Sequence, residues 1–159
     1  MEERLSRDEI LQRLGLEYQR LMATFARLTP EQWTEVGAVG SWTAKDVMAH
    51  LVFWNRFPVQ ELEAAIMGSS LAHPEGTDDE INARTVASFK DWTAEAVRSA
   101  FEHSYGELVE CVKSLPKSAF EVGSPIEQAL DDTVEGALAN NTYAHWPIHE
   151  AQIRAWLDS

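Results

Sequence analysis

The sequence has few of the features that mark secreted or membrane proteins. Only one of its 159 residues, Cys111, is a cysteine, so no disulfide can form within the chain. No apolar run approaches the ~20 residues that a membrane-spanning helix needs. The first residues, 1–4, are charged and do not form the apolar stretch of a leader peptide. We therefore expect a protein of the reducing cytoplasm that does not attach to a membrane.

Positive charge is also scarce. Lys and Arg together number 13 against 26 Asp and Glu, which gives a formal net charge of −13 at pH 7. Nucleic acid and anionic membrane surfaces would repel a chain of this charge. We therefore expect neither as a partner, and we interpret most of the acid excess as a contribution to solubility.

The pattern that is present is helical. Apolar residues recur in steps of three and four, and no segment shows the sustained alternation of a strand. Two segments begin with capping signals, Ser6 with Glu9 and Thr43 with Asp46. No linker divides the chain, so we expect one all-α domain over residues 1–159, built as a four-helix bundle. The predicted long helices cover residues 6–28, 43–67, 93–115 and 133–156, with a short helix at 78–89 and an irregular stretch at 116–131.

Three of the five histidines fall on inward faces of these helices. His145 and His149 are four residues apart, so in a helix they share one face. His50 lies on the inward face of its own segment together with Val47 and Trp54. Imidazoles from two helices of a bundle can hold one metal ion, so the pattern predicts a metal site. The alternative is a set of ordinary core histidines, because such a pair also arises by chance.

Pro147 lies between the two histidines of the last segment. Inside a helix it would remove one backbone hydrogen bond and clash with the carbonyl of Tyr143. A distorted turn beside two inward histidines is consistent with a functional site. The alternative is that Pro147 marks a break and that the segment is two helices.

Two stretches resemble the DinB superfamily. Residues 40–51, GSWTAKDVMAHL, resemble the start of its second helix, and residues 141–149, NTYAHWPIH, resemble its last-helix motif. The resemblance covers nearly the whole chain and implies a four-helix bundle of the up-down-down-up type. It also implies a homodimer, which the six tryptophans support weakly, and a divalent ion, zinc or nickel, held by His50, His145 and His149. Residues 79–82 are similar to the ClbS and DfsB-like branch, whose members protect against reactive small molecules and need not use metal.

These observations favour a metal-dependent enzyme that acts on a small molecule. The resemblance points to a thiol-dependent S-transferase or a hydrolase, with a low-molecular-weight thiol as co-substrate. Candidates for contacts to the ligand histidines or to substrate are the side chains of Asn141, Tyr143, Gln152, Trp54 and Glu150.

Two alternatives stay open. One is a non-catalytic small-molecule-binding or resistance protein that uses the same cavity, and the other is a structural metal or a plain core. Cys111 lies on an apolar seam, where burial raises a thiol pKa, so it is a poor nucleophile. It would matter only if it completed a closed metal site with the three histidines.

Overall fold

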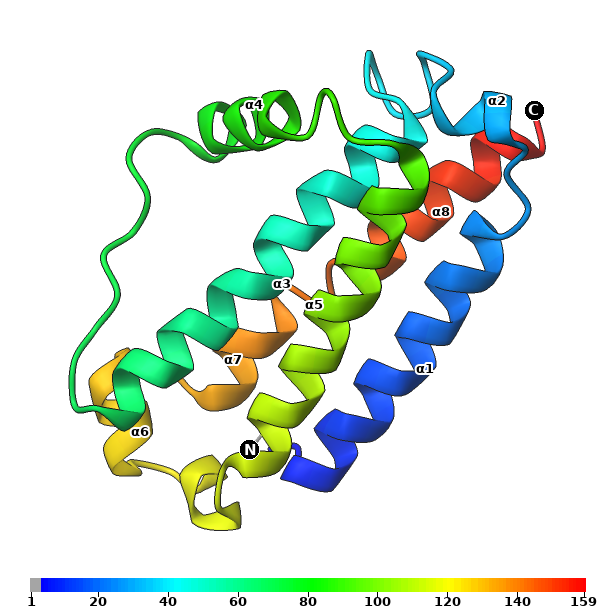
Figure 1. The fold of residues 1–159 in the computed structure, drawn as a ribbon. Helices are drawn as coiled ribbons and strands as arrows, with labels where there is room; N and C mark the ends of the chain where they lie inside the picture. The colour runs from blue at the N-terminus through cyan, green and yellow to red at the C-terminus, as the bar shows by residue number, and fades with distance from the viewer. Residues whose placement is uncertain (1–3) are drawn as a thin grey trace.

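The computed structural model describes residues 4–159, which form helices joined by loops (Figure 1). The charged residues 1–3 lie outside the described residues. In the part that is described, the only β-type pairing is one isolated bridge between Val39 and Trp42, so the all-α prediction is confirmed. The helices are α1 (Arg7–Phe25), α2 (Pro30–Trp33), α3 (Ala44–Ile66), α4 (Asp78–Ser88), α5 (Ala94–Ser114), the 3₁₀ helix η1 (Lys117–Phe120), α6 (Pro125–Leu130), α7 (Val134–Ala139) and α8 (Trp146–Leu157).

Four of these helices enclose the main core. Helix α3 packs against α5, α5 against α1, α1 against α8, and α8 against α3. Figure 1 shows α1 and α8 running in one direction and α3 and α5 in the other. Phe25, Phe101 and Trp146 are among the largest side chains buried between them. None of the helices in residues 4–159 combines the length and hydrophobicity needed to cross a bilayer. The homodimer stays a prediction.

The helix starts follow local side-chain chemistry. The Ser6 hydroxyl accepts the Glu9 N–H at the start of α1. At the start of α3, Thr43 and Asp46 form a complete capping box, in which each side chain accepts the other residue's backbone N–H. Such caps depend only on neighbouring residues, which is why the sequence predicted both starts.

Residues 116–131 were expected to be irregular, and this is wrong, because they contain η1 and α6. The Ser124 hydroxyl accepts the Glu127 N–H, and Pro125 follows at the first helical position. Proline there loses no helical hydrogen bond and its fixed φ suits a helix start. These two residues form a start signal that the apolar periodicity did not reveal.

The segment at 133–156 was expected to be one helix, and this is wrong as well. It is two helices, α7 and α8, joined by a turn over residues 140–145. Pro147 lies in the first turn of α8, where its missing N–H costs nothing. The break therefore avoids the clash that a continuous helix would have suffered, and the alternative interpretation of Pro147 holds.

A buried polar network fixes the start of α8 against its neighbours. The Trp146 indole N–H donates to Asn55 Oδ1 at 2.9 Å, and the Asn55 amide donates to Ser104 Oγ at 3.1 Å. Asn55 and Trp146 are fully buried. The network joins α3, α5 and α8, and Trp146 directly follows His145. It therefore sets the position from which His145 projects.

Candidate metal centre

His50 lies in the second turn of α3, with its side chain almost entirely buried. Val47 and Leu51 on either side belong to the core and hold the helix face inward. The Trp42 ring packs against the imidazole with centroids 5.3 Å apart. The capped start of α3 therefore presents His50 in a defined orientation.

His145 and His149 approach His50 from the α7–α8 turn and the first turn of α8. His145 is the last residue before α8, with φ −93° and ψ −46°, and His149 is one turn further on. Both have backbone positions close to helical, so the four-residue spacing still puts their rings on one side. The structure thus brings together the three histidines that the sequence singled out.

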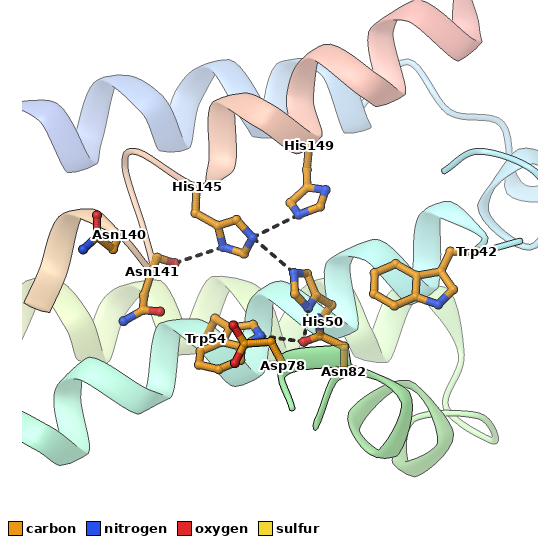
Figure 2. A pocket seen from close by; sticks show the side chains of 9 residues that line it. All are labelled: Trp42, His50, Trp54, Asp78, Asn82, Asn140, Asn141, His145 and His149. Carbon is orange, nitrogen blue, oxygen red and sulfur yellow. Dashed lines mark hydrogen bonds between the residues drawn. The ribbon is translucent and has the colours of Figure 1, made fainter. Parts of the chain in front are cut away.

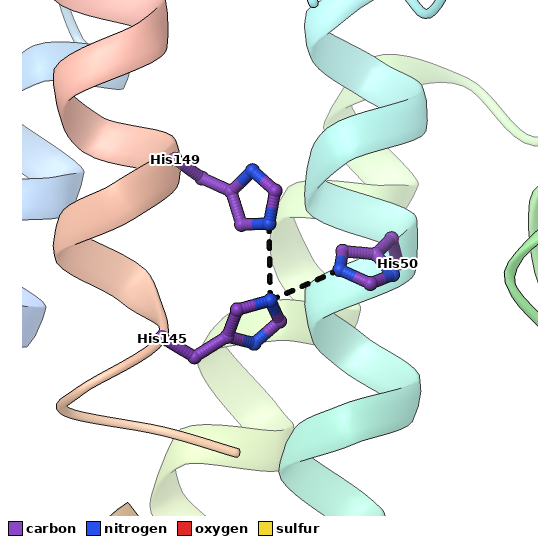
Figure 3. A group of neighbouring side chains, drawn as sticks. All are labelled: His50, His145 and His149. Carbon is purple, nitrogen blue, oxygen red and sulfur yellow. Dashed lines mark hydrogen bonds between the residues drawn. The ribbon is translucent and has the colours of Figure 1, made fainter. Parts of the chain in front are cut away.

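The three Nε2 atoms point toward one another (Figure 3). His145 Nε2 lies 3.2 Å from His50 Nε2 and 3.0 Å from His149 Nε2. A tetrahedral ion with bonds of about 2.0–2.1 Å holds two ligand nitrogens about 3.3 Å apart. These two separations are close to that value, and all three ligand nitrogens lie within 4.8 Å of one another. Within residues 4–159 no Cys, Asp or Glu joins this group.

Each of the three Nδ1 atoms has an oxygen partner. His50 Nδ1 lies 2.9 Å from Asn82 Oδ1, and His149 Nδ1 lies 2.8 Å from Gln152 Oε1. His145 Nδ1 lies 3.3 Å from the backbone carbonyl of Asn141. Oxygens of this kind only accept, so each Nδ1 must carry the hydrogen and donate it. Each Nε2 is then left with a free lone pair.

The orientation of the Asn82 amide is fixed by a second donor. The Trp54 indole N–H, which can only donate, gives its hydrogen to Asn82 Oδ1 at 2.8 Å. The oxygen of Asn82, not its NH₂ group, therefore faces His50. This arrangement, in which a neighbouring group orients a histidine through Nδ1, is the usual support of a metal-binding imidazole.

Burial keeps the histidines neutral. It is the main cause that lowers the pKa of His50 to about 3 and that of His145 to about 4, and the neighbouring histidines lower both further. Burial also lowers the pKa of His149. Neutral imidazole is the form that binds metal. Three lone pairs that face one another at close range repel unless a cation lies among them, so the donor set fits a divalent ion.

A cavity of about 380 Å³ opens beside the three rings (Figure 2). It is lined by two indoles, three amides and one carboxylate in addition to the histidines. The lining residues are Trp42, Trp54, Asp78, Asn82, Asn140, Asn141, His50, His145 and His149. Such a cavity is large enough for a small substrate.

The other predicted residues divide into two groups. Trp54 and Asn141 line the cavity, and Gln152 contacts His149 from behind. Tyr143 does not line it. Its ring is packed in the main core, and burial raises the pKa of the Tyr143 hydroxyl to about 12. The prediction that Tyr143 contacts the site is therefore wrong. Tyr143 lies two residues before His145, a spacing at which neighbouring helical side chains do not share a face.

Glu150 and Cys111 also lie away from the centre. The Glu150 carboxylate accepts hydrogen bonds from Thr24 and Arg154. Cys111 lines a different hollow together with Glu63, and burial raises the pKa of its thiol to about 11. A closed site formed by Cys111 and the three histidines is therefore absent from the described residues.

Sequence reasoning missed the role of α4. Asp78 and Asn82 reach the site from this helix. Asn82 lies 32 residues after His50 in the sequence. The short helix was predicted, and its cap, Thr77, is visible in the sequence. No local signal says that this helix lies over the histidines.

Comparison with known proteins agrees with this fold. The family model for the DinB superfamily matches residues 13–152. No curated protein matches the chain significantly. An uncharacterised protein from Escherichia coli UTI89 is 15% identical in sequence, with a TM-score of 0.80 over 96% of this chain and 93% of that one.

Two further solved structures have the same fold. DfsB, described as a sibling lethal factor precursor, is 15% identical, with a TM-score of 0.84 over 98% of this chain and 97% of its own. The colibactin self-resistance protein ClbS is 12% identical, with a TM-score of 0.82 over 97% of this chain and 96% of its own.

The ClbS structure corrects one expectation. It was solved in complex with double-stranded DNA, so the exclusion of nucleic acid partners from net charge was wrong. Net charge sums over the whole chain, whereas a nucleic acid contacts one face and responds to the local charge there.

The match to the family model covers most of the sequence, and the helical fold agrees with it. The chain belongs to the DinB superfamily.

Proposed function

We propose that the protein is a metal-dependent enzyme that acts on a small molecule, with one divalent ion held by His50, His145 and His149. The observation that carries the proposal is the hydrogen-bond pattern of the three rings. Each Nδ1 atom has an oxygen partner to which it can donate, which leaves the three Nε2 lone pairs free to converge on an ion. Zinc and nickel both suit such a nitrogen donor set.

The site supplies three protein ligands, the number typical of catalytic zinc centres. An ion bound there would supply Lewis-acid chemistry and lower the pKa of a thiol or a water that reaches it. S-transfer from a low-molecular-weight thiol and hydrolysis are the reactions that use this property. A low-molecular-weight thiol would stay reduced in a compartment such as the cytoplasm.

The chain's own residues would bind and orient the substrate. Trp42 and Trp54 form apolar walls against which a substrate would pack, and the Asn140 and Asn141 side chains offer hydrogen bonds. Asp78 provides the one carboxylate among the lining residues, placed to accept a proton from a bound substrate.

The test is a conjugation and hydrolysis screen on protein loaded with zinc or nickel. Low-molecular-weight thiols are paired with electrophiles, and ester and amide substrates are included. We expect turnover that a chelator abolishes and that His149→Ala removes, whereas His103→Ala, a change at an exposed histidine on α5, retains it. Turnover that survives both chelation and His149→Ala would contradict the proposal.

A second candidate is a non-catalytic binding or resistance protein, which the likeness in fold to the self-resistance protein ClbS favours. The same cavity would then hold a reactive small molecule without converting it. Stoichiometric protection that ends after one equivalent per chain would support this candidate, and repeated turnover would support the enzyme.

A further inference from the structure

A second cavity, of about 470 Å³, lies along a neighbouring face of α4 and shares no lining residue with the metal centre. It is bounded by α3, by the link between α3 and α4, and by the residues that lead into α5. Its lining is mostly apolar and aromatic, with two arginines. The side chains that matter here are Phe53, Ile81, Phe89, Trp92, Arg56 and Arg84.

The apolar part of this cavity is incompletely covered. Ile81 is buried at its base, but the Trp92 side chain is 45% exposed. Its indole packs edge-on against Phe89 with centroids 4.7 Å apart. An apolar group bound against this partly exposed indole would remove apolar surface from water, and this burial favours binding.

The charged part consists of arginine alone. No Asp or Glu lines the cavity. Most other arginines of this acidic chain form ion pairs. Within residues 4–159, neither Arg56 nor Arg84 has a carboxylate at ion-pair distance, although one Arg84 nitrogen donates to the backbone carbonyl of Glu75. Two guanidiniums beside an apolar hollow therefore retain donors for an anion.

The remaining polar groups in the lining are already engaged. The Thr85 hydroxyl donates to the carbonyl of Ile81, and the Ser88 hydroxyl donates to the carbonyl of Thr85. A ligand with many hydrogen-bonding groups would find few partners here. A ligand with a single anionic end and an apolar body would satisfy both parts of the cavity.

We propose that this cavity binds a small monocarboxylate with an aliphatic or aromatic body. The guanidiniums of Arg56 and Arg84 hold the carboxylate, and the apolar body lies against Phe53, Phe89 and Trp92. The inference does not depend on the metal centre.

The test is titration calorimetry with octanoate and phenylacetate, compared with octanol and octylamine. We expect saturable binding of both carboxylates, and affinities for octanol and octylamine lower by at least about tenfold, since neither carries the negative charge that the two guanidiniums attract. The double variant Arg56→Gln/Arg84→Gln should weaken octanoate by the same factor. Arg20→Gln, a change at an exposed arginine on α1, should leave its affinity unchanged.

Four results would overturn the proposal, and the fourth comes from the variant His145→Ala. One is equal binding of octanol or octylamine, and the second is unchanged octanoate affinity in the double variant. The third is binding of a single-stranded oligonucleotide, but not of the carboxylates, that depends on the two arginines. The variant His145→Ala separates this site from the metal centre: it should lose metal and keep octanoate affinity. Loss of octanoate binding in that variant would place the carboxylate at the histidines and contradict the proposal.

Discussion

Replacing Asn82 with alanine should weaken metal binding without touching a ligand. Asn82 Oδ1 accepts hydrogen bonds from both His50 Nδ1 and Trp54 Nε1. Without this oxygen nothing in the site holds the hydrogen on Nδ1 of His50. The tautomer with the hydrogen on Nε2 then competes, and that tautomer cannot bind the ion.

The size of the effect follows from these contacts. Loss of such a supporting group lowers metal affinity about 10–100-fold, or about 1.4–2.7 kcal/mol. The metal-free protein should also lose stability, because a buried donor left without a partner costs about 1–3 kcal/mol. Since Asn82 lines the cavity, water can replace part of the lost bonding, and we expect about 2 kcal/mol for the two donors together.

The assay is competition for zinc against a chromophoric chelator, with urea unfolding of the metal-free protein alongside. Asn140→Ala is the matched control, since Asn140 lines the same cavity and makes no side-chain hydrogen bond to a histidine. It should change affinity by no more than about twofold, as expected for an exposed position. If Asn82→Ala binds zinc as tightly as the control does, Asn82 does not orient His50, and the explanation of the site is refuted.

Three further predictions concern stability, pH and the role of the thiol. Asn55→Ala should destabilise the fold by about 2–4 kcal/mol, because it leaves the buried Trp146 indole without an acceptor and opens a cavity. Urea unfolding measures this loss of stability. A loss equal to that of Gln60→Ala, a change at an exposed position, would contradict the prediction. The metal-free protein should lose stability as pH falls from about 6.5 toward 4. The pKa values of His50 and His145 are lowered to about 3 and about 4, so in this range the unfolded chain takes up protons that the folded chain does not. Each such proton lowers the free energy of unfolding by ~1.4 kcal/mol for every pH unit of acidification. His145→Leu should flatten this slope, and an unchanged slope would count against it. Cobalt-substituted protein should show no thiolate charge-transfer band, and Cys111→Ser should leave its spectrum unchanged; a band that this variant abolishes would put Cys111 on the metal.

Local chemistry explains which parts of the fold the sequence predicted. The caps at Ser6 and Thr43 involve residues three positions apart, and the long apolar seams repeat within one helix. The grouping of His50, His145 and His149 followed from the inward positions of these residues. These features depend on periodicity and neighbours, so they could be predicted without knowledge of the packing.

Tertiary placement explains what was missed. The hydrogen bond from His50 to Asn82 depends on how α4 lies over α3, which no pattern within α4 reveals. Tyr143 was one of several candidates among which the sequence could not choose. The turn over residues 140–145 rotates its side chain into the core, while His145 still reaches His50.

The most direct test of the metal centre is the metal content of the purified protein. Mass spectrometry of metals should find about one zinc or nickel per chain, as expected for a single site. The double variant His145→Ala/His149→Ala should lose the ion and keep its helical circular dichroism spectrum. The control His73→Ala/His103→Ala, which changes two exposed histidines, should retain the ion. Full metal occupancy in the first double variant, or a metal-free wild-type protein that does not take up zinc or nickel, would contradict the account.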